Sequence, residues 1–352
     1  MKGSRKDATI RDVAERAGVS ISTVSHVVNK TRRVEDSTRA RIVASIAELD
    51  YRPNLFARGL RGGGSKTIGL IISDIREDFF SQVTKAIESA ANEKGFTVFL
   101  CDSEEDPERE RLYLDMLSDK GVDGIVMAPV DVACPPRLGR GRRLPLVQVD
   151  RRCDGAGLDF VGIDNARHGA AALRHLAALG RSRVGFAGHE SSISTMRDRA
   201  RGVRGAAEAL GAWDEKLLLW LPSRGSDHRA RLRRWLSSAR RPDAVICGNS
   251  NICFSVMGAL DELGLALPGD VALVSFDDPA CFPLMRCPVS AIRQPTDRIG
   301  RAAFAAILAR IEGRAGPEPV DLLLPARFVP RESCGAARAG NRRKTATAVE
   351  RR

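Results

Sequence analysis

The run from Thr9 to Asn29 constrains the fold of this chain most, because it has the pattern of two short helices joined by a tight turn. Thr9 and Asp12 can form a capping box at the start of the first helix. Gly18 ends that helix, since glycine adopts the left-handed conformation at little cost, and Ser20 can cap the second helix. The inner faces are apolar at helical spacing, with Ile10, Val13, Ala14 and Ala17 in the first helix and Val24, Val27 and Val28 in the second.

A third helix, expected from about Asp36 to Leu49, completes a small all-helical head. Its apolar residues Ile42 and Ile46 recur at helical spacing and are expected to pack against Val13 and Val24. This arrangement predicts a helix-turn-helix, in which the second helix lies in the DNA major groove. A helical hairpin with no role in DNA binding has the same spacing, so spacing alone leaves both interpretations open.

The residues at fixed positions in this run resemble a known signature. From Ile10 to Asn29 the chain reads I-x-D-V-A-x-x-A-G-V-S-x-x-T-V-S-x-V-x-N. At nearly every fixed position this resembles the amino-terminal signature of the lactose-repressor (LacI/GalR) family of bacterial transcriptional regulators. The resemblance implies a homodimer that binds a pseudo-palindromic operator in DNA and is controlled by a small-molecule effector.

The start of the second helix is expected to read the DNA sequence. In a helix-turn-helix its first residues face base edges, while nearby hydroxyl and amide side chains hold phosphates. Ile21 can contact a thymine methyl group, and Ser22 and His26 can form hydrogen bonds with purine edges. The side chains expected to hold phosphates are Thr9, Ser20, Thr23, Ser25 and Asn29.

Residues 52–65 follow the head and end in a glycine run. Their composition is that of a plain linker, which is one interpretation. They also resemble the family's hinge helix, which pairs with the hinge of a partner chain in the minor groove. That resemblance implies that Ala57 and Arg58 contact DNA and that Leu60 wedges between base pairs. Gly59 departs from the more usual serine, so this hinge is expected to be weakly helical without DNA.

From residue 67 onward, short apolar runs alternate with amphipathic helical patterns, which is typical of parallel sheets covered by helices on both faces. Strands are expected at 68–72, 96–100, 124–127, 146–149, 184–187, 244–247, 271–276 and 320–324, and helices at 79–94, 108–120, 166–179, 201–210, 230–239, 253–263 and 297–312. This predicts an α/β core of two doubly wound parallel-sheet lobes. The resemblance implies lobes of the periplasmic-binding-protein type, joined by three crossings near Asp164, Gln294 and Pro325.

The predicted organisation has four parts. They are an all-α helix-turn-helix DNA-binding domain at 1–51, a hinge helix and linker at 52–65, a two-lobed effector-binding and dimerisation core at 66–332, and a basic tail at 333–352. The first lobe is expected at about 66–164 and 295–325, and the second at 165–294 and 326–332.

Positive charge lies at the two ends of the chain. Residues 1–66 contain 14 Lys and Arg against 7 Asp and Glu, and residues 333–352 contain 6 against 1. The remaining residues are neutral, with 36 of each sign. A basic leading domain indicates a polyanion-binding module, whereas the tail is expected to be a solvated, disordered segment.

Several classes of protein have no support. The chain has no apolar run of about eighteen residues and no apolar stretch after its basic start, so we expect a cytoplasmic protein without a membrane span. Its eight cysteines include no C-x-x-C pair and no nearby histidine at ligand spacing, so neither a metal site nor a cofactor is expected.

The effector is expected in the cleft between the lobes, since ligands of open parallel sheets bind beyond the carboxyl ends of the strands. Carboxylates and amides follow most predicted strands, and they suit hydroxyl groups or a cationic ligand. Family resemblance adds two aromatic residues to stack on a ring, an arginine to grip an oxygen and an aspartate to accept hydrogen bonds. The expected effector-binding residues are Asp74, Phe79, Phe80, Asp150, Asp164, Arg199 and Asp277.

Each of these residues also has a purely structural interpretation. Phe79 and Phe80 can belong to the core, and Asp150 and Asp164 can cap helices. Arg199 can pair with a neighbouring acid.

Three functions are compared. The favoured one is a sequence-specific regulator of transcription, most simply a repressor, whose partners are operator DNA and a sugar, nucleoside or purine-like effector. The alternative is a solute-binding receptor without catalytic activity, which the core alone would suggest. An enzyme is disfavoured, because no G-x-G-x-x-G follows the first strand and no G-x-S-x-G or phosphate-binding loop is present.

Overall fold

The computed structural model describes residues 8–29, 32–51, 64–132, 144–155, 157–190, 192–223 and 228–336. The chain divides into two compact units, Met1–Ser65 and Lys66–Arg352. The predicted DNA contacts Ala57, Arg58 and Leu60 lie outside the described residues, as does most of the basic tail.

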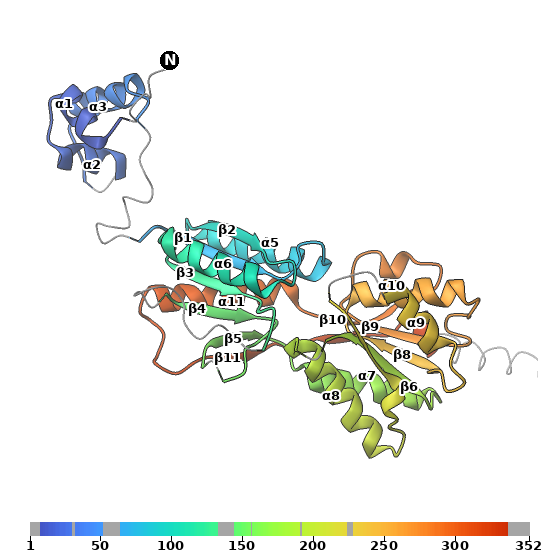
Figure 1. Ribbon diagram of the computed structural model, residues 1–352. Coiled ribbons are helices and arrows are strands. Elements are labelled where there is room, and N and C mark those ends of the chain that lie inside the picture. Colours follow the sequence, from blue (N-terminus) through green and yellow to red (C-terminus); the bar gives the residue numbers. More distant parts are fainter. Residues whose placement is uncertain are drawn as a thin grey trace, which may run out of the picture. The chain divides into compact units, whose positions relative to one another are not determined.

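The first unit is the predicted three-helix head (Figure 1). It consists of α1 (Ile10–Ala17), α2 (Ile21–Asn29) and α3 (Asp36–Glu48). The capping box between Thr9 and Asp12 is present, and Gly18 ends α1 with a φ of 62°. The side chains buried between the helices are Val13, Ala14, Ala17, Val24 and Ile42, with Ile46 and Leu49 packed beside them. The predicted head is therefore confirmed.

The second unit contains two six-stranded sheets (Figure 1). All strands of the first sheet run parallel, in the order β11-β5-β4-β3-β1-β2. They are β1 (Thr67–Ile72), β2 (Thr97–Asp102), β3 (Gly124–Met127), β4 (Leu146–Val149), β5 (Asp159–Gly162) and β11 (Asp321–Leu323). Helices α5 (Asp78–Glu93) and α11 (Thr296–Ile311) pack together over one face, and α6 (Pro107–Asp119) covers the other.

The second sheet has the order β12-β10-β9-β8-β6-β7 and is parallel except for β12. Its strands are β6 (Val184–His189), β7 (Leu218–Leu221), β8 (Ala244–Cys247), β9 (Ala272–Phe276), β10 (Ser290–Arg293) and β12 (Arg327–Val329). Its helices are α7 (Asn165–Ala178), α8 (Ser194–Ala209), α9 (His228–Leu236) and α10 (Ser250–Glu262), and the short 3₁₀ helices are Glu215–Leu217, Phe282–Leu284 and Glu332–Cys334. Helices α7 and α8 pack together, and α9 and α10 cover the opposite face.

The predicted fold class is confirmed, and the chain passes between the two sheets at 163–164, 294–295 and 324–326. Four strands, β5, β7, β10 and β12, were not predicted, and the predicted start of one helix was wrong. Helix α8 begins at Ser194 instead of at Arg201, because its buried residues Met196 and Ala200 alternate with arginines that hide the apolar stripe in the sequence. Among the described residues, no helix has the length and apolar character that crossing a membrane requires.

Helices α7 and α8 approach each other closely at a glycine. A Cβ atom added at Gly202 would lie 1.9 Å from the backbone oxygen of Ala166. One turn away on α8, a Cβ added at Gly205 would meet nothing within 4 Å. Only a residue without a side chain therefore allows this crossing, and the crossing holds Arg199 against α7.

We expect Gly202→Ala to lower the free energy of unfolding by about 1–3 kcal/mol, because the methyl group meets backbone that cannot rotate away. The matched variant Gly205→Ala should be neutral or stabilising by up to about 1 kcal/mol through helix propensity. Urea denaturation followed by circular dichroism measures both. Equal stability of the two variants would contradict the close approach of α7 and α8.

Candidate functional sites

The first candidate site is the start of α2 in the head. Ser20 and Ser22 are exposed there, and Ile21, Thr23, Ser25 and His26 are half-buried. The hydroxyl of Ser20 lies 2.7 Å from that of Ser22 and 2.8 Å from that of Thr23, and it accepts a hydrogen bond from the Thr23 backbone N–H. These polar groups form one surface at a helix N-terminus, where the backbone dipole favours an anion such as a phosphate.

Two of the predicted phosphate contacts need separate mention. The Thr9 hydroxyl donates to Asp12 Oδ2 over 2.8 Å, so its role in the capping box occupies part of its hydrogen-bonding capacity. Asn29 is the last residue of α2, and its side chain lies outside the described part of the chain.

The second candidate site lies between the two lobes of the core. Strand-end residues Asp74, Asp150 and Asp277 come from loops that follow β1, β4 and β9. Contacts from the first lobe to the second include the Glu77 carboxylate with Asn249 and the Asp154 carboxylate with Arg197. The carboxyl ends of the two sheets therefore meet at one cleft, as the sequence pattern predicts.

A buried ion pair forms the wall of the cleft on the first lobe. The terminal nitrogens of Arg151 donate to the two oxygens of Glu105, each over 2.7 Å, and Arg151 is 2% exposed. Burial opposes ionisation, but the Arg151 guanidinium holds the pKa of Glu105 below its ordinary value. The guanidinium carbon lies 5.5 Å from the ring centroid of Phe80. Arg151 is therefore fully engaged at its two terminal nitrogens.

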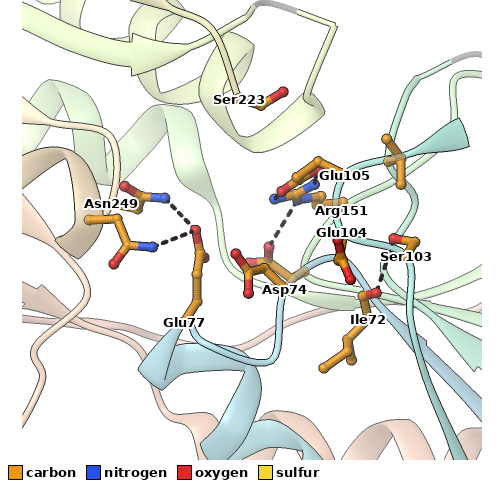
Figure 2. A network of polar contacts seen from close by, with 12 residues as sticks. Ile72, Asp74, Glu77, Ser103, Glu104, Glu105, Arg151, Ser223 and Asn249 are labelled. Carbon is orange, nitrogen blue, oxygen red and sulfur yellow. Dashed lines mark hydrogen bonds and ion pairs between the residues drawn. The ribbon is translucent and has the colours of Figure 1, made fainter. Parts of the chain in front are cut away.

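Glu77 connects the two lobes (Figure 2). Its Oε1 accepts hydrogen bonds from the side-chain amides of Asn249, over 2.8 Å, and Asn251, over 3.4 Å. Asn249 also caps α10, because its Oδ1 accepts from the backbone N–H of Ile252. Burial raises the pKa of Glu77 to about 8, although the charge of Arg151 opposes the shift. At neutral pH most Glu77 carboxyls therefore carry a proton.

Arg199 on α8 is the corresponding buried cation of the second lobe. Its Nε donates to Asn165 Oδ1 over 2.8 Å, and its Nη1 donates to the backbone oxygen of Gly248. The guanidinium carbon lies 4.2 Å from the ring centroid of Phe276. Its remaining nitrogen, Nη2, lies 3.9 Å from Asp150 Oδ1 in the first lobe. Arg199 therefore pairs with an acid across the cleft. The adjacent acid on α8, Asp198, lies instead beside Arg197 and Arg201.

Asp150 and Asp277 occupy equivalent positions in the two lobes. Asp150 follows β4 and Asp277 follows β9. Each of these strands is third in its sheet, counted from β11 in the first sheet and from β12 in the second. Both have left-handed backbone conformations, with φ of 63° and 66°, which are strained for residues other than glycine. Burial raises the pKa of Asp150 to about 6 and also raises that of Asp277. Strain and costly burial at matched positions are features of binding sites.

Two cavities adjoin these aspartates. One, of about 350 Å³, is lined by Asp150, Asp164 and residues of both lobes. The other, of about 160 Å³, is lined by Phe79, Asp277, Gln294 and the start of α11. Gln294 Nε2 donates to Asp277 Oδ1 over 2.7 Å.

The remaining predicted effector residues lie at the edge of the cleft or behind it. Phe79 and Phe80 are 4% and 1% exposed in the core of the first lobe, and only Phe79 borders a cavity. Asp164 caps α7, and Asp74 accepts hydrogen bonds from the side chain of Arg76. The structural interpretation therefore describes Phe80 and Asp164 well, whereas Asp150 caps none of the described helices.

Glu77 and Glu105 were not among the predicted site residues. Both lie within five residues of the end of a predicted strand, in the loops after β1 and β2. The sequence signal that would have identified them is an acidic residue further along the loop than the first two positions after a strand. Among the described residues, no three His, Cys, Asp or Glu side chains are grouped so that they could hold a metal ion.

Comparison with known proteins agrees with this geometry. A family model described as bacterial regulatory proteins, lacI family, matches residues 9–54. A second, described as a periplasmic binding protein-like domain, matches residues 173–334. Among curated relatives, the HTH-type transcriptional repressor PurR of Proteus mirabilis is 34% identical over 86% of this chain and 90% of its own length. PurR of Serratia proteamaculans is 36% identical over the same shares of both chains.

Solved structures show the same architecture over nearly the whole chain. The Lac repressor dimer bound to operator and the anti-inducer ONPF is 25% identical, with a TM-score of 0.78 and coverage of 94% of this chain and 99% of that one. The complex of the transcriptional regulator CelR with cellobiose is 27% identical, with a TM-score of 0.67 and coverage of 93% and 99%. The chain therefore belongs to the lacI family of bacterial regulatory proteins and is a DNA-binding regulator of transcription.

Proposed function

We propose that this protein is a repressor that binds a pseudo-palindromic operator as a homodimer and responds to a small molecule bound between its lobes. The observation that carries the proposal is the combination in one chain of a helix-turn-helix with an exposed hydroxyl surface and a two-lobed core with buried polar groups in its cleft. The PurR relatives are named as repressors, and the Lac repressor was solved as a dimer on operator DNA.

The effector response requires that the ligand bind two states of the core with different affinity. Contacts between the lobes supply such states. The lobes are joined by the hydrogen bond of Asn249 with Glu77 and by the ion pair between Arg197 and Asp154, in which the Arg197 terminal nitrogens lie 2.6 and 2.9 Å from the carboxylate oxygens. We infer that a ligand in the cleft changes how many of these contacts form, and that residues 52–65 transmit the change to the head.

An exposed sheet edge supports the dimer. Strand β2 lies at the edge of the first sheet, where Phe99 and Leu100 are 36% and 45% exposed, and Leu112 on the neighbouring α6 is 64% exposed. Large apolar side chains on an open strand edge favour association with another chain. We infer that this surface of the first lobe contributes to the dimer.

We expect exchange of Ile21 and Ser22 for other residues to change which operator is preferred, at about 1–3 kcal/mol for each lost base contact. Selection of binding sites from a random DNA library, followed by gel shift, measures the preference. Val43→Thr on the exposed face of α3 is the control and should keep the original preference. Uniform weakening on all sequences would assign Ile21 and Ser22 to phosphate contacts instead.

We expect Leu100→Asp to weaken the dimer at least about tenfold, because a charge would be buried in the apolar contact. Analytical ultracentrifugation over a range of protein concentrations gives the dissociation constant. Leu210→Asp is the matched control, since Leu210 is 55% exposed at the end of α8 in the second lobe. A wild-type protein that is monomeric both free and on operator DNA would refute the homodimer.

We expect Arg199→Lys to remove the stabilisation that an effector gives to the wild-type protein. Lysine keeps the charge, but its single nitrogen cannot replace three donors that face Asn165, Gly248 and Asp150. A thermal-shift screen of sugars, nucleosides and purine bases identifies the stabilising compounds, and circular dichroism shows that the variant is folded. Equal ligand-induced shifts in the folded variant and the wild type would place the effector elsewhere.

A further inference from the structure

The buried charges in the cleft do not balance. The side chains of Glu77, Asp150 and Asp277 are all at least 92% buried, and each lies in the loop that follows a strand. Glu105 is the fourth carboxylate, and its charge is matched by Arg151. Arg199 is the second buried cation, and both Arg199 and Arg151 lie 3.9 Å from oxygens of Asp150. Because most Glu77 carboxyls carry a proton at neutral pH, three carboxylates face two cations, which leaves one negative charge without a counterion.

The cations are also engaged with partners in their own lobes. Arg151 gives both terminal nitrogens to Glu105, and Arg199 gives Nε and Nη1 to Asn165 and to the backbone of Gly248. The remaining nitrogens, Nη2 of Arg199 and Nε of Arg151, lie 3.9 Å from Oδ1 and Oδ2 of Asp150. At that distance neither nitrogen forms a hydrogen bond with Asp150.

Two buried oxygens that line the cavities have no hydrogen-bond donor among the described residues. They are Asp150 Oδ1 and Gln294 Oε1, and Asp150 lines the larger cavity while Gln294 lines the smaller one together with Asp277. Asp150 and Gln294 are 6% and 5% exposed. A buried acceptor without a donor is costly, so these two oxygens favour a ligand that donates hydrogen bonds.

The carboxyls also act on one another across the cleft. Burial raises the pKa of Asp150 and of Glu77, and nearby arginines oppose the shift, Arg199 and Arg151 at Asp150 and Arg151 at Glu77. The negative charge of Asp277 then raises both pKa values further. Asp78 and Asp278 raise the pKa of Asp277 itself. A positive charge placed among these groups would be attracted by all of them, and the ring of Phe79, which borders the cavity with Asp277, is also a favourable neighbour for a cation.

We propose that the effector of this protein carries a protonated amine, which pairs with Asp150 of the first lobe and Asp277 of the second and thereby holds the lobes together. The inference rests on the proposed function, because it names the chemical class of the molecule that the cleft binds. An ammonium group supplies both the missing charge and the missing hydrogen-bond donors.

The first test compares the binding of charged amines, two of them amino sugars, with that of neutral sugars. Isothermal titration of the full-length protein uses glucosamine, galactosamine and putrescine against glucose, galactose and N-acetylglucosamine. We expect at least one amine to bind at least about tenfold more tightly than its neutral counterpart. Equal or tighter binding of the neutral compounds, or binding of none of the amines, overturns the proposal. Binding of Mg²⁺ at the same carboxyls in place of amines also overturns it.

Proton release gives a second readout. Burial raises the pKa of Glu77 to about 8, so most Glu77 carboxyls hold a proton at pH 7, whereas Asp150, with a pKa of about 6, is mostly ionised. An ammonium ion in the cleft lowers the pKa of Glu77 and expels its proton, whereas a neutral ligand does not. Titration of glucosamine at pH 7 in buffers with different ionisation enthalpies should therefore show net proton release. No release on binding would contradict contact with the carboxyls.

Asp277→Asn keeps the shape of the side chain and its acceptor for Gln294 but removes the charge. We expect this variant to bind the amine about ten- to a hundredfold more weakly, which corresponds to loss of a charge-assisted hydrogen bond. Asp119→Asn at the exposed end of α6 is the control and should bind as the wild type does. Unchanged amine affinity in Asp277→Asn overturns the assignment.

The empty protein provides a test that needs no ligand. Because burial raises the pKa of Asp150 in the folded chain from its ordinary value of 3.8 to about 6, its favourable contribution to stability is complete below about pH 4 and is lost as pH rises through 6. Asp150→Asn should therefore melt at a higher temperature than the wild type at pH 8, and the difference should vanish toward pH 4. A variant that melts lower at pH 8 would show that the charge of Asp150 is already compensated.

Operator binding separates failure of this inference from failure of the proposed function. If the protein shifts operator DNA but binds neutral compounds as tightly as amines, the proposed function stands and the inference of an amine effector fails. If the protein binds amines but shifts no DNA at any effector concentration, the proposed regulatory function fails and the inference of an amine site stands.

Discussion

Charge buried between the two lobes is the constraint on which the core depends. A carboxylate or guanidinium that leaves water must be paired, because an isolated buried ion is far too costly to persist. Arg151 meets this requirement through Glu105, and Arg199 meets it through Asn165 and the backbone of Gly248. These contacts tie together the loops that follow β2, β4, β5 and β8, so the shape of the cleft follows from the pairing of its charges.

The position of Arg199 depends in turn on the packing of two helices. Gly202 lets α8 approach the backbone of α7, and a Cβ atom added at Gly169 on α7 would lie 2.4 Å from the backbone oxygen of Arg199. At this separation the Arg199 side chain reaches Asn165 at the start of α7. A bulkier residue at either glycine would force the two helices apart. A feature that looks like ordinary helix packing therefore decides the electrostatics of the candidate site.

The two lobes of the core share one feature at equivalent positions. Asp150 and Asp277 each leave a parallel strand in a left-handed conformation, which the surrounding sheet and helices must impose. Their burial raises both pKa values, so keeping these two carboxylates ionised in the cleft costs stability. In the head, by contrast, the polar groups lie near the surface, and the Ser20 hydroxyl is within hydrogen-bond distance of the hydroxyls of Ser22 and Thr23.

The sequence by itself determined the class of the fold and the nature of the head. Apolar periodicity is local, so it identified the three head helices and the alternation of strands and helices, and Gly18 and Thr9 marked the ends of α1 correctly. It also located Asp150 and Asp277, since each directly follows an apolar strand. The start of α8 was misplaced, because charged residues interrupt its buried stripe and the stripe is recognisable only against α7.

Only the tertiary structure decided which polar groups meet. Glu77 and Asn249 are 172 positions apart, and Arg151 and Glu105 are 46 apart, so no local pattern links either pair. The structure also distinguished Phe79, which borders a cavity, from Phe80, which lies behind it under Arg151. The physical reason is that secondary structure follows from contacts between near neighbours, whereas burial, pairing and pKa shifts arise when distant loops share a volume without water.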